Sequence, residues 1–191
     1  MEAEYIIDQT FDNTGEKEYQ LAKGEYENCI FNNLDFSNGD LSGIRFTDCQ
    51  FTGCNLSLAK INQTAFRDAI FKDCKMLGLQ FDSCAAFGLS FRFINCILNH
   101  STFYGTKIKK TLFKDSKLQE ADFSQCDLSE STFLNCDLIN AIFDNSILIK
   151  TDFRSSVNYR INPDNNIIKK AKFSIDGLPG LLFKYDIEID K

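Results

Sequence analysis

The stretch ADFSQ-CDLSE-STFLN-CDLIN, residues 121–140, repeats one pattern every five residues. The third residue of each unit is Phe or Leu, the first is Ala, Ser or Cys, and the others are mostly polar. The same spacing of large apolar residues extends outward from this stretch, from Leu21 to Phe91 and then, two residues out of step, from Phe93 to Phe153. A short fixed period is typical of a solenoid, in which each unit buries its apolar side against its neighbours.

The period predicts which side chains point inward. Five fits neither an α-helix nor a flat strand, but it fits a chain that turns a corner in every unit. The residue two positions before each large apolar residue should point the same way in an extended segment. Those residues are small or uncharged, and from Gly24 to Phe153 no charged residue occupies either position. We therefore expect every charged side chain of the repeats to face water. The apolar residue of each unit, Ala86 among them, and the residue two positions before it should face inward.

The second run of repeats, from Phe93 to Phe153, also predicts how the side chains are distributed among the walls of the tube. Phe alternates there with Leu or Ile, so Phe recurs every ten residues. If four units make one coil, Phe occupies two opposite walls, with Phe93, Phe113, Phe133 and Phe153 in one column and Phe103, Phe123 and Phe143 in another. The period alone requires only an even number of walls. The step at residues 91–93 should either divide the tube into two stacks or make a small bulge.

The units at 121–125 and 126–130 resemble the A(D/N)LXX unit of pentapeptide repeat proteins. This resemblance implies an all-β fold, a right-handed quadrilateral β-helix, over residues 21–153. The chain length, the step at 91–93 and the segment 161–174 also resemble the quinolone-resistance (Qnr-type) group and its microcin-immunity relatives. That narrower resemblance implies a homodimer made through a C-terminal helix and strand. It also implies binding to DNA gyrase or topoisomerase IV by imitation of duplex DNA, with protection from quinolones or toxins.

Three segments are predicted along the chain. Residues 1–20 should form a capping strand over 4–11 and a polar turn through Asn13, Gly15 and Lys17. Residues 21–153 should form the coils, and residues 154–191 should form a C-terminal segment. Within that segment we expect a loop over 155–166, a short helix capped by Asp176 with Pro179 in its first turn, and a strand at 187–189. Its apolar residues would be buried in a dimer or, alternatively, against the last coil. The candidate dimer residues are Leu178, Leu181, Leu182, Phe183, Tyr185, Ile187 and Ile189.

The composition of the chain argues against several kinds of partner and location. The net charge is −6, so nucleic acid is not expected as a direct partner. Residues 1–4 do not read as a signal peptide, and no apolar run approaches the ~20 residues of a membrane span. All eight cysteines fall at inward positions, which predicts reduced, buried thiols and a cytoplasmic location rather than disulfides or a metal site.

Catalytic chemistry is not indicated. The single histidine, His100, falls at an outward position, and no phosphate-binding loop or cofactor motif is present. We therefore expect a binding protein that is not an enzyme and holds no cofactor.

The distribution of charged residues indicates where a partner protein could bind on the surface of the tube. Residues 56–117 carry ten basic and four acidic residues, whereas residues 118–154 carry seven acidic and two basic ones. Regularly spaced carboxylates on a rod would suit a basic DNA-binding groove. They could also be the solvated positions of the repeat, on a scaffold for another protein partner with no effect on topoisomerases. The candidate partner-binding residues are Asp122, Asp127, Glu130, Asp137, Asp144 and Asp152.

Overall fold

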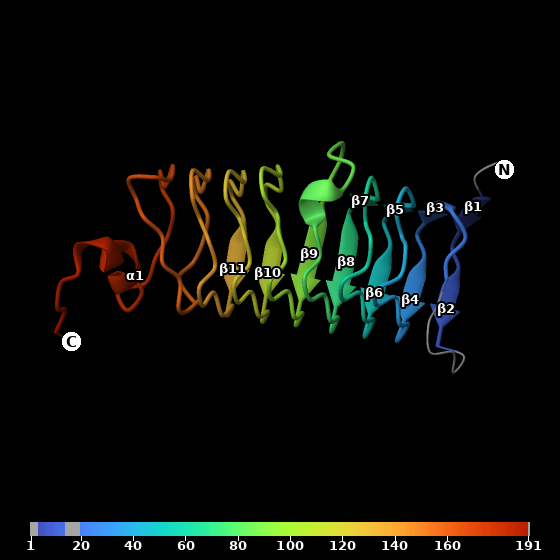
Figure 1. Cartoon of the computed structure of the whole chain (residues 1–191), viewed down its shortest axis with the longest axis horizontal. Coiled ribbons are helices and arrows are strands. Elements are labelled where there is room, and N and C mark those ends of the chain that lie inside the picture. Colours follow the sequence, from blue (N-terminus) through green and yellow to red (C-terminus); the bar gives the residue numbers. More distant parts are fainter. Residues whose placement is uncertain (1–3, 14–19, 191) are drawn as a thin grey trace.

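The computed structural model describes residues 4–13 and 20–190, which wind into a long β-solenoid (Figure 1). Its strands are β1 (Glu4–Ile7), β2 (Thr10–Asp12), β3 (Gly24–Glu27), β4 (Ile30–Asn32), β5 (Arg45–Thr47), β6 (Gln50–Thr52), β7 (Ala65–Arg67), β8 (Ala69–Lys72), β9 (Phe91–Ile94), β10 (Leu112–Lys114) and β11 (Thr132–Leu134). They pair in parallel in two sheets, ordered β1-β3-β5-β7 and β2-β4-β6-β8-β9-β10-β11. Isolated parallel bridges join the coils elsewhere around the tube.

Each coil contains four five-residue units. Phe31 lies opposite Phe51 in the pairing of β4 with β6, and Phe113 lies opposite Phe133 in the pairing of β10 with β11. Partners are therefore twenty residues apart, which confirms the four walls that the resemblance to pentapeptide repeat proteins implied and that the alternation of Phe with aliphatic residues allowed. We number the walls by their inward residues: Tyr26 on the first, Phe31 on the second, Phe36 on the third and Leu41 on the fourth.

Hydrogen bonds between coils satisfy the backbone. The Asn33 N–H donates to the Thr52 carbonyl at 2.8 Å, and the Asp122 N–H donates to the Ser101 carbonyl at 2.9 Å. A proline would remove one of these donors. Both prolines, Pro163 and Pro179, lie outside the predicted run of repeats.

A column of stacked aromatic rings fills the second wall from one end of the described tube to the other. Adjacent rings stand 4.6–5.5 Å apart between centroids and lie within 17° of parallel. The column is Phe11, Phe31, Phe51, Phe71, Phe93, Phe113, Phe133, Phe153 and Phe173. Phe81, Phe103, Phe123 and Phe143 stack likewise on the fourth wall, so both predicted columns are confirmed.

The corners of the tube take left-handed backbone conformations. Asn28, Asp48 and Asn135 have φ of 51°, 53° and 53°, which their short polar side chains tolerate. Leu58 and Lys110 adopt the same conformation at φ 58° and 59°, where a side chain without a local hydrogen bond costs about 1–2 kcal/mol. The coil therefore imposes the left-handed conformation at its corners, even on residue types that do not favour it.

At the N-terminal end, the strand expected over residues 4–11 is present as β1 and β2, separated by Asp8 at φ 55°. Both strands pair with the following coil, β1 with β3 and β2 with β4. Gly15 and Lys17, part of the predicted turn, lie outside the described residues.

The two-residue step makes a bulge and does not divide the tube. Phe71 still stacks on Phe93 at 5.4 Å, so the second wall is continuous across the step. The first wall is interrupted instead, by the residues that follow the 3-10 helix η1 (Phe81–Ser83), which project from the tube as the green loop in Figure 1. The inward assignment of Ala86 is wrong: Ala86 is exposed. Phe91 fills its place beneath Phe66, with 5.8 Å between ring centroids, because the larger side chain buries more apolar surface.

Coiling continues beyond Phe153, where the sequence predicts a loop over 155–166. Val157 bridges to Asp137 and Ile167 bridges to Ile147, both in parallel, and Ile161 is fully buried. The expected loop is therefore a further coil. Its backbone keeps the twenty-residue pairing although its residues depart from the unit pattern.

A short helical segment closes this end of the described chain. It consists of α1 (Pro179–Leu182) and the 3-10 helix η2 (Phe183–Tyr185), with Pro179 in the first turn as expected. Asp176 is not the helix cap, because the capping position is Leu178 and no side chain bonds the helix start. The strand expected at 187–189 is absent from the described structure, where these residues pair with no other strand.

Candidate partner-binding surfaces

The six candidate acidic residues do not share one wall. Asp122 and Asp144 flank inward residues of the fourth wall, Asp127 lies on the first, Asp137 on the third and Asp152 on the second, as the backbone bridges show for all but Asp144. Glu130 stands at the corner after the first wall, at φ 62°. Consecutive units occupy successive walls, so acids that follow one another in the sequence point in different directions.

Three of the six are paired with basic residues of the tube. The Lys109 ammonium lies 3.0 Å from Asp127, which also accepts bonds from the Ser129 N–H and hydroxyl at 3.1 and 2.6 Å. Burial would raise the pKa of Asp127, but the bonds from Ser129 and Lys109 outweigh it and hold that pKa below its ordinary value. Lys150 lies 2.9 Å from Glu130 and lowers its pKa.

Asp152 is the third paired acid. The Arg154 guanidinium donates to both carboxylate oxygens, at 2.7–3.2 Å, and Lys172 lies 3.7 Å away. The bonds from Arg154 hold the pKa of Asp152 below its ordinary value. A carboxylate that is already paired with a basic residue attracts a basic partner less strongly, because the neighbouring positive charge offsets its own.

The other three acids carry no ion pair within the described parts of the chain. Asp122 accepts the Ser124 N–H at 2.8 Å, Asp137 accepts the Asn158 amide at 2.7 Å, and Asp144 accepts the Asn145 and Asn165 amides at 2.9 and 3.1 Å. These neutral partners leave the negative charge in place. Asp137 lies on the third wall and Asp122 on the fourth, and these walls meet at an edge of the tube. Asp144 lies at the other side of the fourth wall, next to the corner residue Asn145 at φ 54°.

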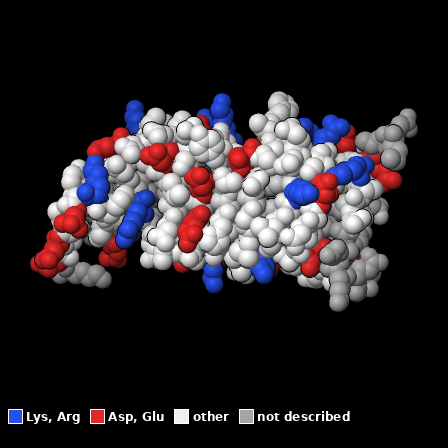
Figure 2. All heavy atoms as spheres, viewed as in Figure 1, with Lys and Arg blue, Asp and Glu red and all other residues white. Residues whose placement is uncertain are grey.

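The structure adds Glu120 to these three, at the corner between the third and fourth walls, with φ 55°. Its carboxylate lies 3.2 Å from Nδ1 of the exposed His100, a histidine that is charged only when protonated. We call Glu120, Asp122, Asp137 and Asp144 the acidic edge. Lys117 borders it, one coil before Asp137 on the third wall. On the face that Figure 2 shows, acidic atoms lie in separate spots beside basic ones, without a continuous stripe.

The C-terminal candidates divide into one buried residue and six exposed ones. Leu181 is 9% exposed and packs on the core of the last coil. The other six are 36–57% exposed: Leu178, Leu182, Phe183, Tyr185, Ile187 and Ile189. Arg160 lies over the Phe183 ring at 6.0 Å, and Lys184 pairs with Asp164. One leucine therefore caps the tube, while an apolar surface remains open to a second molecule.

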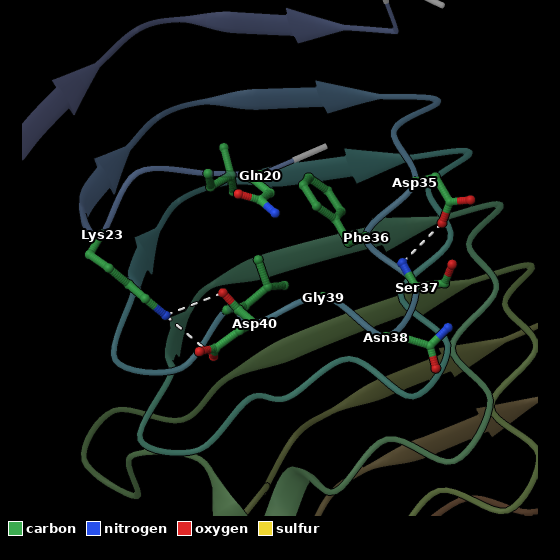
Figure 3. Close-up of a pocket in the computed structure, with 10 residues that line it drawn as sticks. Gln20, Lys23, Asp35, Phe36, Ser37, Asn38, Gly39 and Asp40 are labelled. Carbon is green, nitrogen blue, oxygen red and sulfur yellow. Dashed lines mark hydrogen bonds and ion pairs between the residues drawn. The ribbon is translucent and has the colours of Figure 1, made fainter. Parts of the chain in front are cut away.

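A pocket of about 400 Å³ opens near the N-terminal end, beside Phe36 and Leu41 (Figure 3). The Lys23 ammonium crosses it to Asp40, 3.3 Å from the carboxylate and 3.2 Å from the carbonyl of that residue. Bonds from Ser42, with a smaller contribution from Lys23, lower the pKa of Asp40 to about 2. The polar groups of this pocket thus bond to one another.

A second pocket was not foreseen from the sequence. It has a volume of about 380 Å³ and lies beside the projecting loop, between Phe87 and Tyr104. Phe87 is 84% exposed, and Arg67 lies over its ring at 5.7 Å. The only signal in the sequence was a phenylalanine off the five-residue spacing, next to Gly88.

Residues 4–13 and 20–190 hold no sign of a metal site or a membrane-spanning helix. No three metal-binding side chains come together there, and no helix in this part is long and apolar enough to cross a membrane. All eight cysteines are free and buried, as predicted. Burial raises the pKa of Cys49 and of Cys126 to about 12, which makes them poor nucleophiles.

Comparison with known proteins identifies the family. One family model, described as a pentapeptide repeat region, matches residues 89–158, and another, described as pentapeptide repeats in eight copies, matches residues 29–68 and 49–84. Together they span more than half of the chain, and neither describes a catalytic domain. No protein with a curated description matches.

Solved structures share the fold. A trypsin-treated variant of QnrB1, a plasmid-mediated fluoroquinolone resistance protein, is 18% identical, with a TM-score of 0.53 over 98% of each chain. Full-length QnrB1 is 20% identical, with a TM-score of 0.50 over 97% of this chain and 98% of that one. HetL, involved in heterocyst differentiation regulation in the cyanobacterium Nostoc sp. strain PCC 7120, is 15% identical, with a TM-score of 0.46 over 88% of this chain and 84% of its own. The repeat models and the four-walled solenoid establish that this chain belongs to the pentapeptide repeat protein family.

Proposed function

We propose that this pentapeptide repeat protein is a non-enzymatic binding protein whose partner is DNA gyrase or topoisomerase IV, and that it protects the enzyme from quinolones or toxins. The observation that carries the proposal is the likeness to QnrB1 along almost the whole of both chains. The acidic edge supplies the negative surface that a DNA-binding groove would accept.

The proposed mechanism is imitation of duplex DNA by the acidic edge. Asp122, Asp137 and Asp144 keep their charge for a partner because their bonds come from neutral groups. Asp127 and Asp152 are already paired and contribute less. A homodimer through Leu182, Phe183 and their exposed neighbours would place two acidic edges in one particle and lengthen the surface offered to the enzyme.

A supercoiling assay tests this proposal. Purified protein would be titrated into gyrase and topoisomerase IV, with and without a fluoroquinolone. Restored activity under drug, or inhibition without it, is the expected result. No effect on either enzyme at many-fold molar excess would overturn the proposal and favour a scaffold for a different protein.

Matched variants test the mechanism separately. Neutralising the acidic edge with Asp122→Asn, Asp137→Asn and Asp144→Asn should abolish the effect on the topoisomerase. Neutralising the three paired acids with Asp127→Asn, Glu130→Gln and Asp152→Asn removes the same number of charges and should leave most of the effect. Equal losses from the two sets would contradict imitation of DNA by the acidic edge.

A further inference from the structure

The projecting loop opens a pocket because it interrupts one wall of the tube. The sheet of the first wall ends at β7, whereas the sheet of the second wall continues to β11. Residues of the loop then face the next coil across a space of about 380 Å³ lined by Asp82, Cys84, Phe87, Leu89, Tyr104 and Lys107, among others. This volume lies in the range of about 300–1,000 Å³ that is typical of small ligand sites.

Two exposed aromatic side chains and a buried leucine line the pocket. Phe87 is 84% exposed and Tyr104 is 46% exposed, while Leu89 at 9% forms a buried floor. Elsewhere in the repeats the tube buries its phenylalanines. A large apolar side chain held outside the core is typical of a binding surface, where aromatic anchors contribute much of the affinity.

The loop holds Phe87 in a defined position. Gly88 has φ +73°, which favours glycine, and a Cβ there would meet the Arg67 side chain at 3.4 Å. Arg67 lies over the Phe87 ring at 5.7 Å, a cation–π contact that orients both groups. Phe87 is therefore presented on a supported turn.

Two basic side chains without an ion pair stand at the pocket. Lys107 lines it and Arg67 lies over the Phe87 ring, and neither makes an ion pair within residues 4–13 and 20–190. The buried Nε of Arg67 has no hydrogen-bond acceptor in these residues. Asp82 is the one acidic residue of the lining, so the two cations leave a net positive charge at the pocket, which favours an anionic ligand.

We infer that this pocket binds a segment of a partner protein in which an aromatic or aliphatic side chain stands beside carboxylates. The apolar side chain enters between Phe87 and Tyr104, and the carboxylates meet Lys107 and Arg67. The preference for an acidic partner is opposite to that of the acidic edge, so the two surfaces take different partners. The inference does not rest on the proposed function.

The test uses the intact protein and a capped peptide, Asp-Glu-Phe-Asp-Glu, followed by NMR of the backbone amides. Saturable shifts confined to residues 82–90 and 104–107 are expected. A peptide with Ala in place of Phe, and one with Lys in place of each acid, should each bind at least about tenfold more weakly. No saturable binding at millimolar peptide, or equal binding of the basic peptide, would overturn the inference.

Variants locate the site. Phe87→Ser and Lys107→Gln should each weaken binding of the acidic peptide by about tenfold or more. Ile167→Ser removes a 54% exposed apolar residue from a distant coil, Lys169→Gln removes an exposed charge from that same coil, and both should bind as the unchanged protein does. Affinity unaffected by Phe87→Ser would overturn the inference.

Single-stranded nucleic acid is the other class of ligand that aromatic and basic groups bind together, and an eight-nucleotide single-stranded DNA tests it. It should bind more weakly than the acidic peptide. If it binds more tightly and competes with the peptide, the pocket is a nucleic-acid site and the inference is wrong. The assay contains no topoisomerase, so failure here is distinguishable from failure of the proposed function.

Discussion

Phe153 and Phe173 stack with their ring centroids 5.5 Å apart and their planes 2° from parallel. This contact is the last step of the second-wall column, and Phe173 lies beyond the unbroken run of apolar residues at the five-residue spacing, which Asn158 and Pro163 interrupt. The coil therefore persists where its sequence signature has ended, because the preceding coil offers both backbone partners and a ring on which to stack.

The final coil should contribute to stability as the others do. Ile161→Ala removes a fully buried side chain and is expected to lower the free energy of unfolding by about 2–4 kcal/mol. Ile167→Ala changes a 54% exposed residue of the same coil and should stay within about 0.5 kcal/mol. Chemical denaturation followed by circular dichroism measures both. Near-neutral values for the two would mean that residues 154–173 behave as a loop in solution.

The inward and outward assignment can be tested on adjacent residues. Phe123→Ala leaves a cavity in the fourth-wall column and should cost about 3–5 kcal/mol. Asp122→Asn keeps an acceptor for the Ser124 N–H, which it bonds at 2.8 Å, so its effect should stay within about 0.5 kcal/mol. Equal effects in denaturation experiments would refute the assignment.

Asp127 should add stability at neutral pH and lose it in acid. Its pKa is lowered in the folded protein because the Ser129 and Lys109 bonds outweigh the effect of burial. A group with a lowered folded pKa stabilises fully above its unfolded pKa of about 3.9, and this stabilisation disappears as the pH falls through the folded value. Asp127→Asn should therefore flatten the stability curve below about pH 4, measured by denaturation from pH 7 to pH 2. An unchanged acid limb would contradict the pairing.

The thiols should be inert until the tube opens. All eight thiols are buried, so a reagent cannot reach them in the closed tube. Burial raises the pKa of Cys84 and of Cys136 to about 12, and the thiolate is the reactive form. Hydrogen bonds from Cys74 lower the pKa of Cys54 and of Cys96, so these two are protected by their burial alone. We expect no reaction of the native protein with a thiol-specific chromogenic disulfide, and immediate reaction of all eight cysteines in guanidinium. Phe87→Cys provides a control thiol in an exposed position, which should react at once in the native protein. Rapid native labelling of several other thiols would show that the coils open locally.

The C-terminal segment should determine the oligomeric state. Leu182→Glu with Phe183→Glu adds charge to two exposed apolar residues, so it should dissociate a dimer without unfolding the coils. Ile142→Glu, a 50% exposed position on the fourth wall, serves as the control and should stay dimeric. Sedimentation equilibrium distinguishes the two. A monomeric unchanged protein at tens of micromolar would mean that the segment only caps the tube through Leu181.

The five-residue spacing predicted which side chains of the tube are buried, because it reports the inward positions directly. The number of walls came from the resemblance to pentapeptide repeat proteins, since the period alone requires only an even number. It could not predict which residues would leave the core at the two-residue step. Ala86 and Phe91 both lie on the spacing, and only packing beneath Phe66 decides between them. The candidate acids were correctly placed outside, but their grouping depends on the coil length. With twenty residues per coil, Asp122 and Asp137 fall on adjacent walls, and Asp127 lies on the wall opposite that of Asp137.

The projecting loop also reveals how the fold handles a change in chain length. Lys75 bridges to Ile97 across the loop at a spacing of twenty-two residues, and Ile97 bridges to Lys117 at twenty again. The irregularity is contained within one turn, so the coils on either side keep their partners. Additional residues inserted at this point would enlarge the protrusion without shifting the rest of the tube, which makes the loop the place where the molecule can acquire a new specificity without refolding.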